Sequence, residues 1–178
     1  MKTKFFLYFF LLPIMLFPQL NPQSKKLTKK FFPDPNIEIN TPAFNKKKGF
    51  TKYDEMMSFL NEQIANHSDV VKLEFVGESQ KGKQIPMLFF DRKNSNEKVK
   101  VFFQAGLHGN EPASTEGILY FMDQILNNEK YNKLLDRITL AIIPMANIDG
   151  YEINNRYASN GLDLNRDCLL YTSDAADE

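Results

Sequence analysis

The sequence predicts an α/β fold in which helices flank a sheet with both parallel and antiparallel pairing. Short apolar or alternating segments typical of strands occur at 71–75, 85–90, 99–105 and 138–143. Segments with apolar residues at helical spacing lie at 51–64 and 112–126. A strand, a helix and a second strand in succession imply parallel pairing through a crossover. Strands joined by short polar turns favour antiparallel pairing, so we expect a mixed sheet.

The first elements are expected in the order lead-in, helix, hairpin. Residues 24–49 are rich in Pro, Asn and Lys and predict an irregular lead-in. Thr51 is expected to begin a helix, because Asp54 makes a near capping box, and His67 stands where that helix should end. The polar residues 77–83 then predict a turn between two strands that pair antiparallel.

The later elements are expected to form a parallel unit. The strongly apolar segment 99–105 predicts a buried strand, and Pro112 suits the first turn of the helix that follows. That helix carries a wide apolar stripe made of Ile118, Leu119, Met122, Ile125 and Leu126. The segment 138–143 predicts a second buried strand, parallel to the first.

Composition is that of one globular domain with a core. The chain has 178 residues, of which 43% are hydrophobic and 25% charged. Lys and Arg together number 22, as do Asp and Glu, so the excess positive charge that nucleic-acid binding requires is missing. We expect no nucleic-acid partner. Cys168 is the single cysteine, so stability must come from packing and not from disulfides.

The N-terminus predicts export. Lys2 and Lys4 precede an apolar run from Phe5 to Phe17, which is too short to cross a bilayer comfortably and is typical of a signal peptide at 1–23. The exit from this run lacks the small-x-small cleavage pattern, so an uncleaved anchor is one alternative and a buried core segment another. We expect a secreted or periplasmic protein, and the uncleaved anchor, if that alternative holds, would be its one contact with the membrane.

Two polar clusters follow the strands at 99–105 and 138–143, where open α/β sheets bind ligands. In the first, His108 and Glu111 stand three residues apart and can converge on one ion, and such nitrogen and oxygen ligands suit zinc. The alternative is a histidine and a glutamate that only cap the following helix. Gly106 and Gly109 allow close backbone approach, and the strand-to-helix position favours zinc.

The second cluster, 144–167, is rich in guanidinium and amide groups. Its candidate binding residues are Arg156, Asn165 and Arg166. An arginine can hold a carboxylate through two parallel hydrogen bonds, and a neighbouring amide can add a donor. The alternative is a surface loop whose Arg and Asp side chains pair with each other.

These residues resemble the zinc carboxypeptidases of the carboxypeptidase A type. Residues 108–111 resemble the family's His-x-x-Glu zinc motif, and 147–150 resemble its Asn-Pro-Asp-Gly turn with Ile in place of Pro. Residues 161–166 resemble its Gly-Val-Asp-Leu-Asn-Arg segment. Residues 53–56 and 77–83 are similar to its opening helix and its Gly-x-Ser-x-x-Gly-Arg hairpin. The likeness covers roughly residues 50–167.

The resemblance implies a role for each candidate. His108 and Glu111 would bind Zn²⁺, and Asn165 and Arg166 would hold the free C-terminal carboxylate of a peptide substrate. Arg156 would stabilise the oxyanion as a zinc-activated water attacks the scissile carbonyl. An internal peptide bond presents no carboxylate to Arg166, so exopeptidase selectivity follows.

The chain departs from the family's pattern in two respects. The family's third zinc ligand, a histidine, and its general-base glutamate lie downstream of the Asn-Arg motif, and no counterpart occurs here. The only other histidine, His67, is expected to serve a helix end. The tail 168–178 resembles translated adapter DNA, so we expect residues 50–167 to be the N-terminal part of a catalytic domain, incomplete at its C-terminal side. Such a chain should be inactive and prone to aggregate through an open sheet edge.

Two other functions share these residues. Deacylases of the aspartoacylase and succinylglutamate desuccinylase type resemble the same His-x-x-Glu and Asp-Leu-Asn-Arg segments, and a non-catalytic module could bind carboxylates through Arg166. The export signal and the turn at 147–150 favour a peptidase over a deacylase. Both zinc ligands and both arginines are intact, which argues against a decayed site. We therefore expect a zinc metallocarboxypeptidase.

Overall fold

The computed structural model describes residues 24–33, 36–93 and 97–166. The expected signal segment 1–23 and tail 168–178 lie outside the described residues. The chain divides into two compact units, Met1–Glu38 and Ile39–Glu178. None of the helices in the described ranges is long and apolar enough to cross a bilayer.

The described part of the first unit contains a helix, α1 (Lys25–Phe31), within the lead-in that was expected to be irregular. The prediction was wrong here because a capping side chain stabilises the start of this helix, and the segment has no apolar stripe that would have indicated a helix. The Ser24 hydroxyl accepts a hydrogen bond from the Leu27 N–H at 3.3 Å. Lys29 and Lys30 stand in the last turn, where positive charge suits the helix dipole.

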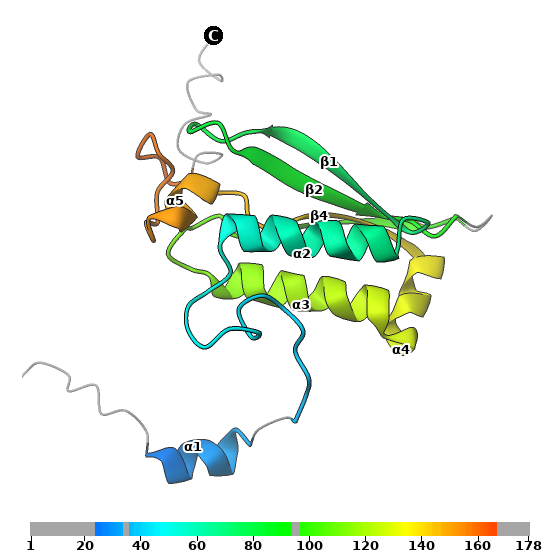
Figure 1. Cartoon of the computed structure of the whole chain (residues 1–178), viewed down its shortest axis with the longest axis horizontal. Coiled ribbons are helices and arrows are strands. Elements are labelled where there is room, and N and C mark those ends of the chain that lie inside the picture. Colours follow the sequence, from blue (N-terminus) through cyan, green and yellow to red (C-terminus); the bar gives the residue numbers. More distant parts are fainter. Residues whose placement is uncertain (1–23, 34–35, 94–96, 167–178) are drawn as a thin grey trace, which may run out of the picture. The chain divides into compact units, whose positions relative to one another are not determined.

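The second unit is built on a four-stranded mixed sheet (Figure 1). Its strands, in the order in which they pair, are β1 (Val71–Glu78), β2 (Gln84–Phe90), β4 (Ile138–Ile143) and β3 (Val99–Gln104). The pairs β1–β2 and β2–β4 are antiparallel, and β3–β4 is parallel. The predicted α/β class and mixed sheet are confirmed.

The position of β3 differs from the expectation of a buried strand. It pairs with β4 on one side only, and no other strand among the described residues borders its second edge. The side chains of Val99 and Phe102 are 66% and 54% exposed. Apolar composition predicted that the strand exists, but a strand of the same composition can lie in the middle or at the edge of a sheet.

Two long helices, α2 (Tyr53–Asn66) and α3 (Ala113–Asn127), lie on the same side of the sheet (Figure 1). Their apolar faces and the inner face of the sheet form one core, which includes Met56, Leu60, Leu88, Leu119, Met122 and Ile142. A short α4 (Glu129–Asn132) and a 3₁₀ turn (Lys133–Asp136) connect α3 to β4. The core holds β3 and β4 in place, and both candidate clusters follow these strands.

The start of α2 lies two residues later than expected. Thr51 does not cap it; instead, the Thr51 N–H and hydroxyl both donate to the buried Glu116 carboxylate of α3, at 2.7 and 2.8 Å. At the helix start, Glu55 and not Asp54 accepts the backbone N–H of Lys52, at 2.7 Å. These contacts anchor the entry to α2 beside the first turn of α3.

A short helix, α5 (Ile148–Glu152), follows β4 in a region where the sequence predicted a turn at 147–150 and no helix. Its first turn is capped by Asn147, whose side-chain oxygen accepts the Gly150 N–H at 3.0 Å. Five residues are too few to show a helical stripe.

Candidate active site

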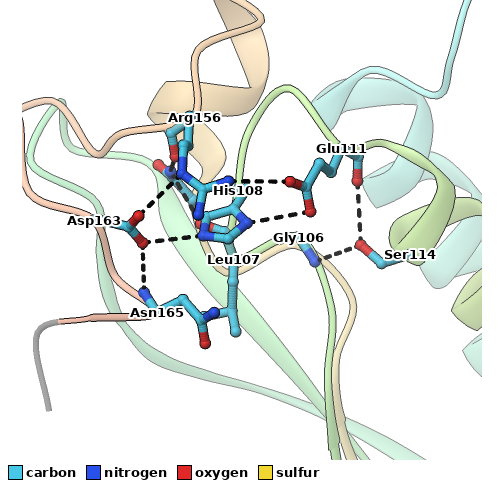
Figure 2. A network of polar contacts seen from close by, with 9 residues as sticks. Gly106, Leu107, His108, Glu111, Ser114, Arg156, Asp163 and Asn165 are labelled. Carbon is cyan, nitrogen blue, oxygen red and sulfur yellow. Dashed lines mark hydrogen bonds and ion pairs between the residues drawn. The ribbon is translucent and has the colours of Figure 1, made fainter. Parts of the chain in front are cut away.

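The two candidate clusters meet at one edge of the sheet because β3 and β4 run parallel. Backbone pairing continues past both strands, since Ala146 N–H donates to Ala105 O at 2.9 Å and Asn147 N–H donates to Gly106 O at 2.8 Å. The loop that carries His108 is thereby held beside the loop that carries Arg156. Figure 2 shows the polar network that results.

His108 and Glu111 face each other across the expected metal position. His108 Nδ1 lies 3.1 Å from Glu111 Oε2. Two ligands that a tetrahedral zinc holds at ~2.0–2.1 Å are roughly 3.3 Å apart, so this spacing fits two ligands of one ion. His108 is buried, with 8% exposed, whereas the Glu111 side chain is 58% exposed and faces solvent. The pair is therefore open on one side.

Asp163 holds the opposite nitrogen of the imidazole. Its Oδ1 lies 3.0 Å from His108 Nε2 (Figure 2). A carboxylate in this position favours a ring proton on Nε2, and a metal could then take Nδ1 as its ligand. Asp163 was not among the site residues predicted from the sequence. The signal that could have found it is its place in the 161–166 motif, together with the rule that a ligating histidine needs a second partner.

Arg156 bridges the two carboxylates of the site. Its Nε donates to Asp163 Oδ2 at 3.0 Å, and its Nη1 donates to Glu111 Oε1 at 3.2 Å (Figure 2). The sequence left open a surface loop whose Arg and Asp side chains pair with each other, and Arg156 and Asp163 do form such a pair. The pair lies within the cluster around His108, where it places a guanidinium beside the metal-ligand candidates.

The charge of Asp163 is stabilised by its neighbours. Burial raises its pKa, but hydrogen bonds from His108, from Arg156 and from the Asn165 N–H together lower the pKa below its usual range. Asp163 is therefore an anion at neutral pH and a strong acceptor for the Nε2 proton of His108.

A cavity of about 230 Å³ opens at the network. His108, Glu111, Ser114 and Asn165 are among the residues that line it. Arg166 is exposed and does not line the cavity, although its backbone N–H donates to Asp163 O at 2.9 Å. The structure thus brings together His108, Glu111, Arg156 and Asn165, and leaves the Arg166 side chain outside this hollow.

No third ligand for a metal is present near this pair within the described ranges. No group of three or more His, Cys, Asp or Glu side chains among these residues is arranged to hold an ion. The other histidine, His67, contacts Asn127 Oδ1 at 2.9 Å, beside the last residue of α3. The His108 loop precedes the first residue of α3, and this 15-residue helix is roughly 22 Å long, so His67 is far from the site.

Asp149, which belongs to the turn motif at 147–150, is buried and connects three segments. It accepts hydrogen bonds from the Ser79 hydroxyl at 2.7 Å, the Lys81 N–H at 3.1 Å and the Ser159 hydroxyl at 3.2 Å. These contacts fasten the β1–β2 turn and the Arg156 loop to α5.

The sequence matches the family described as zinc carboxypeptidase over residues 56–174, which is more than half of the chain. This chain belongs to the zinc carboxypeptidase family. The matched region includes both polar clusters of the candidate site.

Several curated carboxypeptidases are similar to this family member. Carboxypeptidase 2 of Trichophyton rubrum is 28% identical over 149 residues, which cover 74% of this chain and 28% of the relative. Carboxypeptidase D of Anas platyrhynchos is 33% identical over 111 residues, which cover 58% of this chain and 8% of the relative. The chain thus spans roughly a quarter or less of the length of these carboxypeptidases.

Solved carboxypeptidase structures share the fold. A metallo-carboxypeptidase from Burkholderia cenocepacia superimposes with a TM-score of 0.61 at 20% identity, over 67% of this chain and 33% of that one. The carboxypeptidase A of Helicoverpa armigera gives a TM-score of 0.58 at 22% identity, over 75% of this chain and 35% of that one. At these identities the likeness supports the architecture alone.

Proposed function

We propose that this chain carries part of the active site of a zinc-dependent carboxypeptidase that removes residues from the C-terminus of peptides. The observation that carries the proposal is the pairing of His108 Nδ1 with Glu111 Oε2 at 3.1 Å, with Asp163 behind the imidazole. A buried, oriented imidazole beside an exposed carboxylate matches the ligand chemistry of zinc.

His108 and Glu111 would hold the ion, and each residue around them has a task. Bound zinc would supply a Lewis acid that polarises a carbonyl and acidifies a water. Asp163 keeps the ring proton of His108 on Nε2, so that Nδ1 remains a ligand. Arg156 holds its guanidinium against Glu111 and Asp163, beside the proposed ligands, where it could stabilise negative charge on the oxygen of a scissile carbonyl.

Selectivity for a chain end would come from the segment that follows Asp163. Asn165 lines the cavity, and its side-chain amide can donate to a terminal carboxylate. Arg166 is the next residue and could add a bidentate contact, for which its side chain would have to turn toward the cavity. An amidated C-terminus or an internal peptide bond would offer these donors no negative charge.

We also propose that the polypeptide is inactive by itself and binds zinc weakly. A catalytic zinc usually takes three protein ligands and one open position, whereas the residues that the structure describes bring together two. Export through the segment at 1–23 belongs to the same proposal, and it is supported by Lys2, Lys4 and the apolar run that follows.

Binding of matched peptides tests the substrate class on this chain. We would titrate the zinc-loaded, isotope-labelled protein with a short peptide that has a free C-terminus and with its C-terminal amide, and follow the NMR signals of the Arg156 and Asn165 side chains. The free acid is expected to shift these signals and the amide is not. Equal shifts with both peptides would contradict the proposal, and a response to N-acetylaspartate but to neither peptide would favour the deacylase.

A further inference from the structure

The side chain of Asn147 connects the two halves of the site. It is buried, with 3% exposed. Its Nδ2 donates to the carbonyl of Leu107 at 3.2 Å and to the carbonyl of Arg156 at 3.3 Å. Leu107 directly precedes His108, so one amide group spans from the backbone of the metal-ligand loop to the backbone of the arginine.

The hydrogen-bonding capacity of Asn147 matches this position. A side-chain amide has two N–H donors and one carbonyl acceptor. Both donations go to the two loops, while Oδ1 accepts the Gly150 N–H at 3.0 Å. An aspartate of the same size would keep the acceptor but would set a negative oxygen against two carbonyl oxygens. The donor function can therefore be separated from the helix cap by one substitution.

The backbones around Asn147 are packed so closely that small shifts matter. A Cβ on Gly109 would lie 2.1 Å from Gly150 C and 2.4 Å from Asn155 O, and a Cβ on Gly150 would lie 2.5 Å from Tyr157 O. The His108 loop thus meets α5 and the start of the Arg156 loop backbone against backbone, and the buried Asn147 amide lies beside this contact.

We propose that Asn147 is a positioning residue, which fixes the distance between the zinc ligand His108 and Arg156. Its relevance to catalysis rests on the proposed function, but the positioning itself does not. The Arg156 contact to Glu111 cannot replace it, because Glu111 is largely exposed and its side chain can follow a shifted arginine. Asp163 joins the side chains of His108 and Arg156, whereas Asn147 joins the backbones that carry them.

The test compares Asn147→Asp with Asn160→Asp in the full chain. Asn160 lies in the same loop, is exposed, and uses only its side-chain oxygen, which accepts from Leu162 N–H at 3.1 Å, so the control retains its contact. The first readout, taken without metal, is the ¹⁵N signals of the His108 ring and of Arg156 Nε. The second is the affinity for Co²⁺, measured by its absorption bands.

We expect N147D to shift both side-chain signals and to weaken Co²⁺ binding at least tenfold, while core methyl signals and N160D remain as in the wild type. A second variant, Asn147→Ser, keeps a capping oxygen but cannot reach the two carbonyls, and it should act like N147D.

Unchanged side-chain signals in either folded variant would overturn the proposal. Loss of folding in both at 5 °C would also overturn it, since Asn147 would then serve global stability. If the wild type binds no Co²⁺, the proposed function fails, and the metal-free signals still decide the role of Asn147.

Discussion

Asp163 is the residue that links the arginine of the site to its histidine. It accepts from His108, Arg156 and the Asn165 N–H at once. The sequence motifs identified His108 and Glu111 because these residues are close in the chain. They did not identify Asp163 as the partner of the imidazole, although it lies in the 161–166 motif, because it is 55 residues away and becomes a neighbour only through the fold.

The ionisation of Asp163 predicts an acid-sensitive contribution to stability. Its pKa in the folded state is lower than in the unfolded chain, so the contribution is complete above the unfolded value of ~3.9 and is lost as pH falls through the lower folded value. Urea unfolding of the wild type and of Asp163→Asn between pH 6 and pH 3 measures it. The difference between the two proteins should be constant at pH 5–6 and shrink below about pH 4. A difference that does not change with pH would contradict the assignment.

The buried hydroxyl of Tyr151 allows a second prediction about stability. Burial, and then the nearby charges of Glu116 and Glu55, raise the pKa of its hydroxyl, and this hydroxyl has no hydrogen-bond partner among the described residues. Tyr151→Phe should therefore leave the free energy of unfolding unchanged or raise it by up to about 1 kcal/mol.

Tyr53→Phe is the matched control for that substitution. The Tyr53 hydroxyl donates to Gln84 O at 2.8 Å, so its removal should cost about 1 kcal/mol. Thermal and urea unfolding of both variants compare the two sites. A clear loss of stability in Tyr151→Phe would show that its hydroxyl has a partner after all.

At the scale of elements, periodicity predicted the long helices and the strands but not their neighbours in space. The strand β4 was predicted at its observed bounds, Ile138–Ile143, and its parallel pairing with β3 follows from the helix between them. The position of β4 between β2 and β3 depends on where the chain re-enters the sheet after α3. The pattern of apolar residues does not encode this choice. The short α1 and α5 were missed because each depends on a capping side chain.

The close contact between the His108 loop and α5 predicts that one added methyl group at Gly109 strongly destabilises the protein. Gly109→Ala would place Cβ within 2.1–2.4 Å of the backbone of Gly150, Tyr151 and Asn155, so the loops must separate. We expect a loss of about 2 kcal/mol or more in unfolding free energy. Gly117→Ala, in α3 with open space around its Cβ, should instead stabilise by ~0.5–1 kcal/mol. Similar stabilities for the two variants would refute the close packing.

At the scale of the whole molecule, the exposed edge of β3 predicts self-association. Val99 and Phe102 are exposed along a strand whose outer backbone groups have no strand partner within the described part of the chain. The isolated chain should sediment as oligomers at high concentration, and Phe102→Lys should shift it toward monomer. Ile153→Lys, which adds the same charge at an exposed site after α5, should have little effect. Equal behaviour of the two variants would mean that another surface drives association.

The binding of one zinc ion by His108 and Glu111 is the central claim, and zinc K-edge X-ray absorption combined with calorimetric titration tests it most directly. We predict one weakly bound zinc per chain with nitrogen and oxygen ligands at ~2.0–2.2 Å, lost in His108→Ala and in Glu111→Gln and retained in the control His67→Ala. Absence of stoichiometric binding at millimolar zinc, or binding that survives both site substitutions, would contradict the assignment of the site.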